Sequence, residues 1–303
     1  MKHIIFTLLS LLFLIIMLLF PSETLHGTTN GLLLWFQIVL PSLLPYFIIT
    51  NLLIRTNAFY FVTKLCGPLF QHFFRVSPNG SFAILTGFFC GYPIGAKVTS
   101  DLVKQNKISN SEGNYLLSFC NNSSPAFISN YIILQQLNDP SLLIPSILLL
   151  FLSPILSSFI FRRYYKIQKT QQKTFSNSHI YFHFQLLDDS IMNAFETITK
   201  IGGYIIMFSI LFSLGTHTPL HAFLPILEIT NGISYLTKTS QNFIYTYVSI
   251  MVLTSFGGLC SIAQTYSVIQ GSKLSILSYT IEKLITALVT SLLAIIYITI
   301  ILR

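Results

Sequence analysis

Two polar, helix-breaking stretches decide the fold of this chain: Thr86-Gly-Phe-Phe-Cys-Gly-Tyr-Pro-Ile-Gly-Ala-Lys97 and Phe119-Cys-Asn-Asn-Ser-Ser-Pro-Ala-Phe127. Both lie among apolar sequence. Their prolines and glycines interrupt helices, and their Asn and Lys side chains are costly in hydrocarbon. Irregular backbone is tolerated at membrane depth only where protein buries it or where it lines a water-filled cavity. The two stretches therefore predict broken helices around a polar cavity, an arrangement typical of a substrate site.

The composition is that of a membrane protein. Hydrophobic residues make up 52% of the 303 residues and charged residues only 9%, against roughly 25% in soluble domains. The net charge of +8 does not indicate nucleic acid as a partner, because five of the 17 basic residues fall in one loop between apolar stretches. They are Arg162, Arg163, Lys166, Lys169 and Lys173. The positive-inside rule explains these charges if the loop is cytoplasmic. The apolar composition makes a lipid bilayer the expected partner.

Six apolar stretches are candidate spans, most of them near the roughly 20 residues that a spanning helix needs. They are Ile4 to Phe20, Gly31 to Ile54, Tyr115 to Leu137, Leu142 to Phe161, Ile201 to Leu227 and Ile276 to Leu302. The first is long and lacks a small-residue cleavage pattern, which favours a retained span or signal anchor. Two further apolar stretches, Ser81 to Val98 and Ser249 to Gln264, are rich in glycine.

The positive charges predict that Ser81 to Val98 is a re-entrant hairpin. If this stretch crossed the membrane, Lys104 and Lys107 would lie opposite Arg55, Lys64 and Arg75, and the basic loop would face outward. A hairpin that enters and leaves on one side places all of them inside. The first spans of the two halves of the chain then run in opposite directions.

The second half repeats this pattern in outline. Phe89 to Lys97 matches Phe256 to Gln264 in its Phe, Gly and Ala positions, which predicts a second hairpin there. The expected fold is an all-α polytopic membrane protein of one domain. It is an inverted repeat with two re-entrant helical hairpins and broken transmembrane helices, a design that recurs in secondary transporters.

The motifs do not indicate an enzyme. The four cysteines are scattered without C-x-x-C spacing, and no H-E-x-x-H or G-x-S-x-G motif is present. The pairs His179/His183 and His217/His221 have no Glu between them, so no metal site is expected. Gly91 to Lys97 lacks the spacing of a phosphate-binding loop. We expect no cofactor, and the sequence leaves a coupling ion undetermined.

The candidate substrate-binding residues lie in and near the helix breaks. Lys97 offers a cation to an anionic substrate, or else snorkels to the membrane surface. The amides of Asn121 and Asn122 ligate a substrate, or else bond neighbouring helices, and the glycines alternatively permit close helix packing. The interpretation of Glu282 and Lys283 as interfacial residues also stays open. The full candidate set is Gly91, Tyr92, Gly95, Lys97, Asn121, Asn122, Ser123, Ser124, Glu228, Ser261 and Gln264.

A series of motifs in fixed order resembles the YlbJ/SpoVV sporulation integral membrane proteins. The resemblance covers about residues 31 to 290. It rests on Gly31-Leu-Leu-Leu-Trp-Phe, Leu40-Pro-Ser-Leu-Leu-Pro-Tyr-Phe, Gly91-Tyr-Pro-Ile-Gly-Ala-Lys97, Ser118-Phe-Cys-Asn-Asn-Ser-Ser-Pro-Ala-Phe-Ile, Gly202-Gly-Tyr-Ile-Ile-Met-Phe-Ser, Glu228-Ile-Thr-Asn-Gly and Gly257-Gly-Leu-Cys-Ser-Ile-Ala-Gln264.

The resemblance implies a nucleoside-recognition (gate) domain, shared in outline with concentrative nucleoside transporters. The expected domains are a first span or signal anchor (1–30), a first gate-like repeat (31–140), a linking span with the basic cytoplasmic loop (141–185) and a second, inverted gate-like repeat (186–303). The resemblance further implies a spore-forming bacterium and a place in its cell membrane or in the membrane around the forespore.

The function that the resemblance implies is a transporter or channel for a small planar carboxylate, dipicolinic acid, during sporulation. Two alternatives stay open: a nucleoside or nucleobase transporter, and a non-transporting membrane protein of spore-envelope assembly. The expected partners besides lipid are a small anionic or nucleoside-like substrate. A homo-oligomer or other sporulation membrane proteins are further partners that the sequence leaves open.

Overall fold

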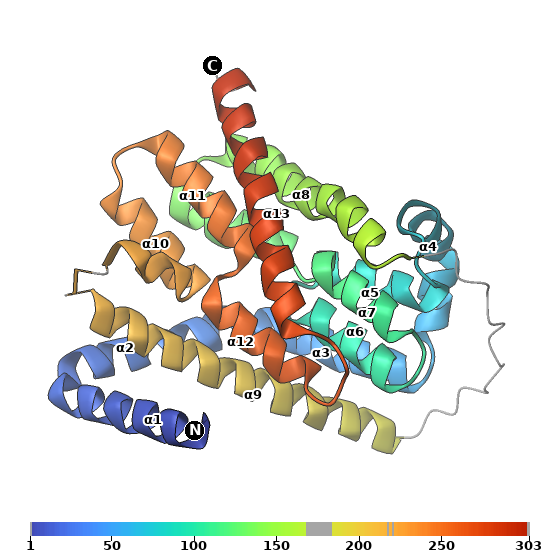
Figure 1. Cartoon of the computed structure of the whole chain (residues 1–303), viewed down its shortest axis with the longest axis horizontal. Helices are drawn as coiled ribbons and strands as arrows, with labels where there is room; N and C mark the ends of the chain where they lie inside the picture. Colours follow the sequence, from blue (N-terminus) through green and yellow to red (C-terminus); the bar gives the residue numbers. More distant parts are fainter. Residues whose placement is uncertain (1, 168–183, 217, 220, 302–303) are drawn as a thin grey trace.

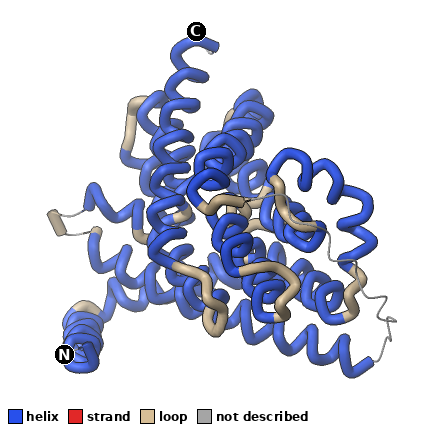
Figure 2. Tube along the Cα trace, turned by 45° about the vertical axis from the view of Figure 1, so that its right-hand side comes forward, coloured by secondary structure: helices blue, strands red, loops and turns tan. Residues whose placement is uncertain are grey.

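The fold is known from a computed structural model that describes residues 2–167, 184–216, 218–219 and 221–301. These residues form helices and loops and contain no strand, as Figure 2 shows. Five helical segments are long and apolar enough to cross a membrane, and Thr7–Leu19 is a shorter apolar helix. The five are Pro21–Arg55, Pro140–Tyr164, Phe184–Gly215, Phe243–Ile269 and Ile276–Ile300. The prediction of an all-α polytopic membrane protein is confirmed.

The halves of the chain begin with long helices that pack antiparallel. Helix α1 (Lys2–Leu19) leads into α2 (Pro21–Leu34) and α3 (Leu40–Arg55), which are joined by a π-helical turn and lie along α9 (Phe184–Gly215) (Figure 1). The Trp35 indole donates to the Ile198 carbonyl at 3.0 Å, and Arg55 lies 3.1 Å from Asp189. Early residues of α2–α3 thus meet late residues of α9, and late residues of α2–α3 meet early residues of α9. The two halves enter the bundle in opposite directions.

The first hairpin follows the short helix α4 (Phe59–Phe74). It consists of α5 (Pro78–Phe89) and α6 (Ile94–Lys104), which pack against each other. Ser77 caps the start of α5 by accepting the Gly80 N–H at 3.1 Å, and Gly91 turns the chain at the tip with a φ of +87°. The Asn79 amide donates to the Lys107 carbonyl at 2.9 Å, so both ends of the hairpin lie together. This is the geometry expected of a re-entrant segment.

The next helix is broken, as the polar stretch predicts. Helix α7 (Asn110–Phe119) ends before Cys120, the backbone is non-helical over 121–124, and a helix resumes at Pro125 and continues as the π-helical segment η2 (Phe127–Leu137). The short turn η3 (Pro140–Leu142) then leads into α8 (Leu143–Tyr164), which runs back. Pro125 supports the break because it removes a backbone donor.

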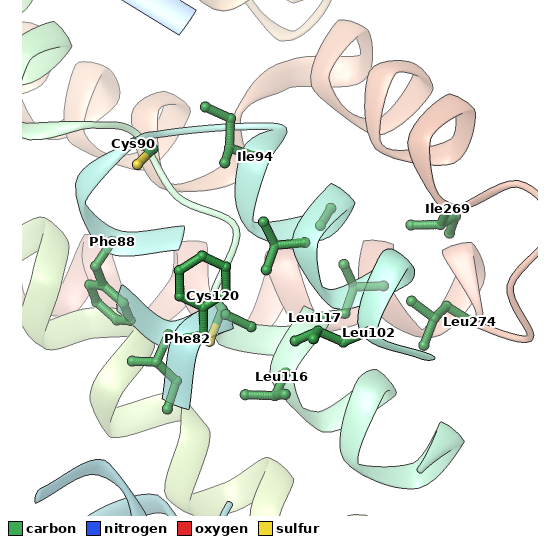
Figure 3. Packing of buried hydrophobic residues seen from close by; sticks show 14 of the residues in the cluster. Phe82, Phe88, Cys90, Ile94, Leu102, Leu116, Leu117, Cys120, Ile269 and Leu274 are labelled. Carbon is green, nitrogen blue, oxygen red and sulfur yellow. The ribbon is translucent and has the colours of Figure 1, made fainter. Parts of the chain in front are cut away.

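The first hairpin packs directly on this break. A Cβ atom at Gly87 or Gly95 would collide with the carbonyl oxygen of Cys120, so only glycine permits this approach. Around the contact, Phe82, Phe88 and Ile94 of the hairpin gather with residues of α7, and Ile269 and Leu274 join them from the second half of the chain (Figure 3). The hydrophobic core therefore joins both repeats.

The second half contains a shorter hairpin and a second broken helix. The 3-10 segment η4 (His221–Ile226) and α10 (Ile229–Thr239) pack together, with Glu228 between them. Helix α11 (Phe243–Phe256) is followed directly by α12 (Gly258–Ile269), and α13 (Ile276–Ile296) continues as the π-helical end η5 (Tyr297–Ile301). Helix α6 packs on α12, and α10 packs on η2, so each hairpin contacts the broken helix of the other half.

The position predicted for the second hairpin was wrong. The residues from Ser249 to Gln264 form the centre of the broken helix α11–α12, which has the length and composition of a single span. Gly257 and Gly258 have φ values of +89° and +77°, which interrupt the helix, but α12 restarts at once and leaves no residues for a reversal. Phe256 to Gln264 thus corresponds in position to the first break rather than to the first hairpin tip.

Two basic residues of the described chain, Arg162 and Lys107, bond backbone carbonyls near the open end of the first hairpin. Arg162 donates to the Phe73 carbonyl at 2.8 Å, and Lys107 donates to the Ile54 carbonyl at 3.1 Å. Partial burial lowers the pKa of the Lys107 ammonium. Lys169 and Lys173, like the pair His179/His183 and His217, lie outside the described residues.

Candidate functional site

A pocket lies where the hairpin tips and the two helix breaks meet. Its cavity volume is about 80 Å³, and apolar side chains such as Ile38, Leu43 and Ile205 form part of its wall. The polar part of the wall contains seven of the eleven predicted residues. They are Gly91, Tyr92, Ser123, Ser124, Glu228, Ser261 and Gln264. Residues far apart in sequence are therefore brought to one site.

Four helix starts converge on this pocket. The wall includes residues beside the start of α6, before the helix that resumes at Pro125, at the start of α10 and at the start of α12. The first N–H groups of a helix have no partner within it, and the helix dipole places partial positive charge there. Such ends favour anions and hydrogen-bond acceptors. Several of these N–H groups already have partners within the protein: those of Thr230 and Asn231 bond to Glu228, and that of Phe127 bonds to the Ser124 hydroxyl. The helix dipoles still place partial positive charge around the pocket.

Glu228 contributes the carboxylate of the pocket wall. Its side chain is buried, and its two oxygens accept the backbone N–H groups of Thr230 and Asn231 at 3.0 and 2.8 Å. The residue is therefore the N-cap of α10, and the helix terminus offsets much of its negative charge. Glu228 is both a structural cap and an acceptor that faces the cavity.

A hydrogen-bond chain ties the first hairpin to the second broken helix. The Ser123 hydroxyl donates to the Tyr92 hydroxyl at 3.0 Å, and the Tyr92 hydroxyl donates to the Thr254 carbonyl at 2.6 Å. Nearby, beside Gly257, the Ser261 hydroxyl donates to the Gly258 carbonyl at 3.0 Å. These bonds orient the hydroxyls that surround the pocket.

The two asparagines of the first break lie behind the pocket. The Asn121 amide donates to Thr265 at 3.0 Å and to Tyr279 at 2.8 Å, and its oxygen accepts the Ala96 N–H at 3.3 Å. The Asn122 amide donates to the Phe119 carbonyl at 2.7 Å. Asn121 therefore links the break to α6, α12 and α13, which is the interhelical role that the sequence left open. Gly95 likewise serves close packing against the break.

Lys97 does not line the pocket. Its ammonium lies 2.8 Å from the Asp101 carboxylate, one turn further along the same helix, and the side chain is largely buried. This ion pair gives Lys97 a partner without a substrate. Its predicted contact with an anionic substrate stays a prediction.

The sequence interpretation underrated Lys283. This side chain is 1% exposed, and its ammonium donates to the Asn121 carbonyl at 3.0 Å and to the Asn122 side-chain oxygen at 3.4 Å. It also lies 5.6 Å from the centre of the Tyr92 ring, within cation–π range. The signal was present in the sequence, because an ionisable residue inside an apolar span marks a functional site by default.

A second cavity of about 410 Å³ lies beside the pocket, toward the start of α2 and the end of α9. Its wall includes polar residues such as Glu23, His26 and Lys238. Asn231 joins the two sites, because its side chain donates to Ser209 at 2.9 Å while its backbone N–H is bonded to Glu228. The larger cavity is at the end of α2–α3 and α9 that is remote from the Arg55–Asp189 pair.

Comparisons with known proteins agree with the motifs. Residues 36–169, which contain the first hairpin and the first helix break, match the family model "Gate: Nucleoside recognition". The chain is also 26% identical over 306 aligned positions to "Sporulation integral membrane protein YlbJ" of Bacillus subtilis (strain 168), an alignment that covers 88% of this chain and 75% of that protein. No solved structure matches the chain. The resemblance is therefore confirmed: residues 36–169 match the Gate model, and the chain is similar to the sporulation protein YlbJ. Its helices are those of a multi-pass integral membrane protein.

Proposed function

We propose that the protein is a membrane carrier, rather than an enzyme, and that its substrate binds in the pocket between the two hairpins. The observation that carries the proposal is the convergence of four helix starts on one cavity at the crossing of two broken helices. Secondary transporters bind substrates at such crossings. The relationship to a protein named for sporulation supports a role in that process, in the membrane around the forespore or in the cell membrane of a spore-forming bacterium.

The proposed substrate class is a small planar carboxylate, with dipicolinic acid as the leading member. Helix N-termini suit carboxylate oxygens, and so does the Ser124 hydroxyl, which accepts the Phe127 N–H at 3.2 Å and keeps its own proton for donation. The negative charge of Glu228 opposes an anion, but two backbone N–H groups offset it. Lys283 adds a positive charge behind Tyr92.

A nucleoside or nucleobase is the second candidate. The family model that matches residues 36–169 is described by nucleoside recognition, and a buried carboxylate such as Glu228 is a strong acceptor for sugar hydroxyls. The two candidates differ in what they need from Glu228. A nucleoside gains from its charge, whereas a dicarboxylate does not.

Equilibrium binding to the purified full-length protein tests the proposal. Titration calorimetry with dipicolinate and with adenosine should give saturable heat for one of them, and Ser261→Trp should abolish it by filling the cavity. Asn130→Trp, an exposed position on the same broken helix as Ser123, is the matched control and should retain binding. Absence of saturable binding of either compound would contradict the carrier proposal and favour an assembly role.

A further inference from the structure

Helix α13 carries a buried positive charge that has no carboxylate partner. Lys283 is 1% exposed, and among the described residues the ion pairs are Arg55–Asp189, Lys97–Asp101 and Lys200–Glu196. Its neighbour Glu282 accepts the hydroxyl of Tyr165 instead. An uncompensated ammonium in a protein interior is costly. Other groups must therefore stabilise Lys283.

Oxygen atoms of the first helix break supply that stabilisation. The Lys283 ammonium donates to the backbone carbonyl of Asn121 and to the side-chain oxygen of Asn122, at 3.0 and 3.4 Å. Both acceptors follow directly after the C-terminus of α7, where the helix dipole places partial negative charge. The face of the Tyr92 ring, 5.6 Å away, adds a further cation-attracting group.

This ligand set is of the kind that binds alkali ions. In transporters with broken helices, unwound backbone carbonyls and the C-terminal ends of half-helices coordinate sodium. Here the same groups contact an ammonium that reaches in from a different helix. The oxygens of Asn121 and Asn122 are thus engaged by a cation that is covalently attached to the protein.

We propose that the oxygens at the break after α7 form an alkali-ion site and that the Lys283 ammonium, a cation tethered to α13, occupies this site in place of a sodium ion. The protein then joins its two repeats without bound sodium. The inference deepens the proposed carrier function, on which it rests for its meaning in transport. A tethered cation cannot cross the membrane with a substrate. Sodium therefore does not drive transport through this site.

The test removes the ammonium and offers sodium in its place. Methionine is one atom shorter than lysine, so Lys283→Met vacates the position of the Nζ atom while it keeps most of the apolar contacts. Thermal unfolding of the purified full-length variant is measured in sodium chloride and in N-methyl-D-glucamine chloride at equal ionic strength. We expect a lower melting temperature in N-methyl-D-glucamine and a sodium-dependent rise, because a ligand that binds only the folded state stabilises it.

Lys107→Met is the matched control. Lys107 also donates to a backbone carbonyl and to an asparagine oxygen, of Ile54 and Asn57, but it lies at the half-buried end of the hairpin, where water can replace it. Its melting temperature should be equal in the two salts. A sodium response in Lys283→Met no larger than in this control would overturn the inference.

A measurement on the unaltered protein keeps the inference falsifiable if Lys283→Met does not fold. The unaltered protein should melt at the same temperature in both salts, and stabilisation by sodium would overturn the proposal. Both readouts concern stability and not uptake. Failure of the carrier proposal therefore shows as absent binding and uptake, whereas failure of this inference shows in the salt dependence of melting.

Discussion

Lys283 and Asn121 are 162 positions apart in the chain, yet the ammonium of one donates to the backbone carbonyl of the other at 3.0 Å. The bond joins the last helix of the second repeat to the break in the first. Asn121 in turn reaches α6 and α12 with its side chain. The region behind the pocket is thus a polar junction of both repeats, and changes there should affect the relative position of the pocket walls.

Asn121→Leu should strongly destabilise the protein. The substitution leaves the Tyr279 hydroxyl and the Ala96 N–H without their Asn121 partner, and each unsatisfied buried group costs about 1–3 kcal/mol. Thermal unfolding in detergent measures the effect. Asn130→Leu, at an exposed position, is the control and should melt near the wild-type temperature. Equal melting of the two variants would show that the junction does not stabilise the fold.

Gly95→Ala should disrupt the packing of the first hairpin on the helix break. The added methyl group collides with the Cys120 carbonyl, and a backbone atom cannot move aside as a flexible side chain can. Overpacking of this kind costs typically 1–3 kcal/mol. Gly203→Ala is the control, because a Cβ atom there meets nothing within 4 Å. Melting temperatures of both variants decide, and an unchanged value for Gly95→Ala would contradict the close contact.

The first hairpin should have both ends on one side of the membrane. Single cysteines at Asn79 and Asn106, in a chain whose native cysteines are replaced by alanine, should react with an impermeant maleimide from the cytoplasmic side. A cysteine at Gln241, in the loop after α10, should react from the opposite side. Reaction of Asn79 and Asn106 from opposite sides would exclude a re-entrant hairpin.

Lys97→Gln should leave uptake close to that of the wild type at equal protein abundance. The reason is that Lys97 is paired with Asp101 and does not line the pocket. A direct contact with a substrate carboxylate would instead contribute about 1.5–3 kcal/mol, so its loss would lower affinity roughly tenfold to a hundredfold. A decrease of that size would place Lys97 in the binding site after all.

Glu228→Gln should separate the two candidate substrates. Glutamine retains one acceptor oxygen for the start of α10 but loses the charge and leaves one of the two backbone N–H groups without an acceptor, so the fold should lose about 1–3 kcal/mol. Affinity for a nucleoside should fall because a charge-assisted hydrogen bond is lost, whereas affinity for dipicolinate should be equal or higher because a repulsive charge is removed. Calorimetric titration of the variant with both compounds checks this. A loss of dipicolinate binding alone would contradict the proposed place of Glu228.

The helix breaks of the first half could be predicted because glycine, proline and asparagine act locally. Gly91 and Pro125 impose a turn and a break whatever surrounds them, and the positive charges limited the topology of the hairpin. The second hairpin was misplaced because a short Phe-Gly-Ala match does not distinguish a hairpin tip from a break within one helix. That distinction depends on whether the next helix folds back, which tertiary packing decides.

The composition of the pocket was predicted better than its electrostatics. Polar residues at helix breaks had to meet one another or a cavity, and seven of the eleven predicted residues line the pocket. The sequence marked Lys283 as an ionisable residue inside an apolar span, but it did not show that Lys283 rather than Lys97 lies near the pocket, because the partners of Lys283 are in a distant segment. Long-range contacts of this kind are absent from any local pattern.

The most direct test of the carrier proposal is uptake of labelled dipicolinate into proteoliposomes that contain the purified protein. The proposal predicts saturable uptake above that of empty liposomes, loss of uptake in Ser261→Trp, and retention in Asn130→Trp. Competition by unlabelled dipicolinate should be stronger than competition by adenosine. Uptake no greater than in empty liposomes, with the protein shown to be folded and inserted, would contradict the proposal.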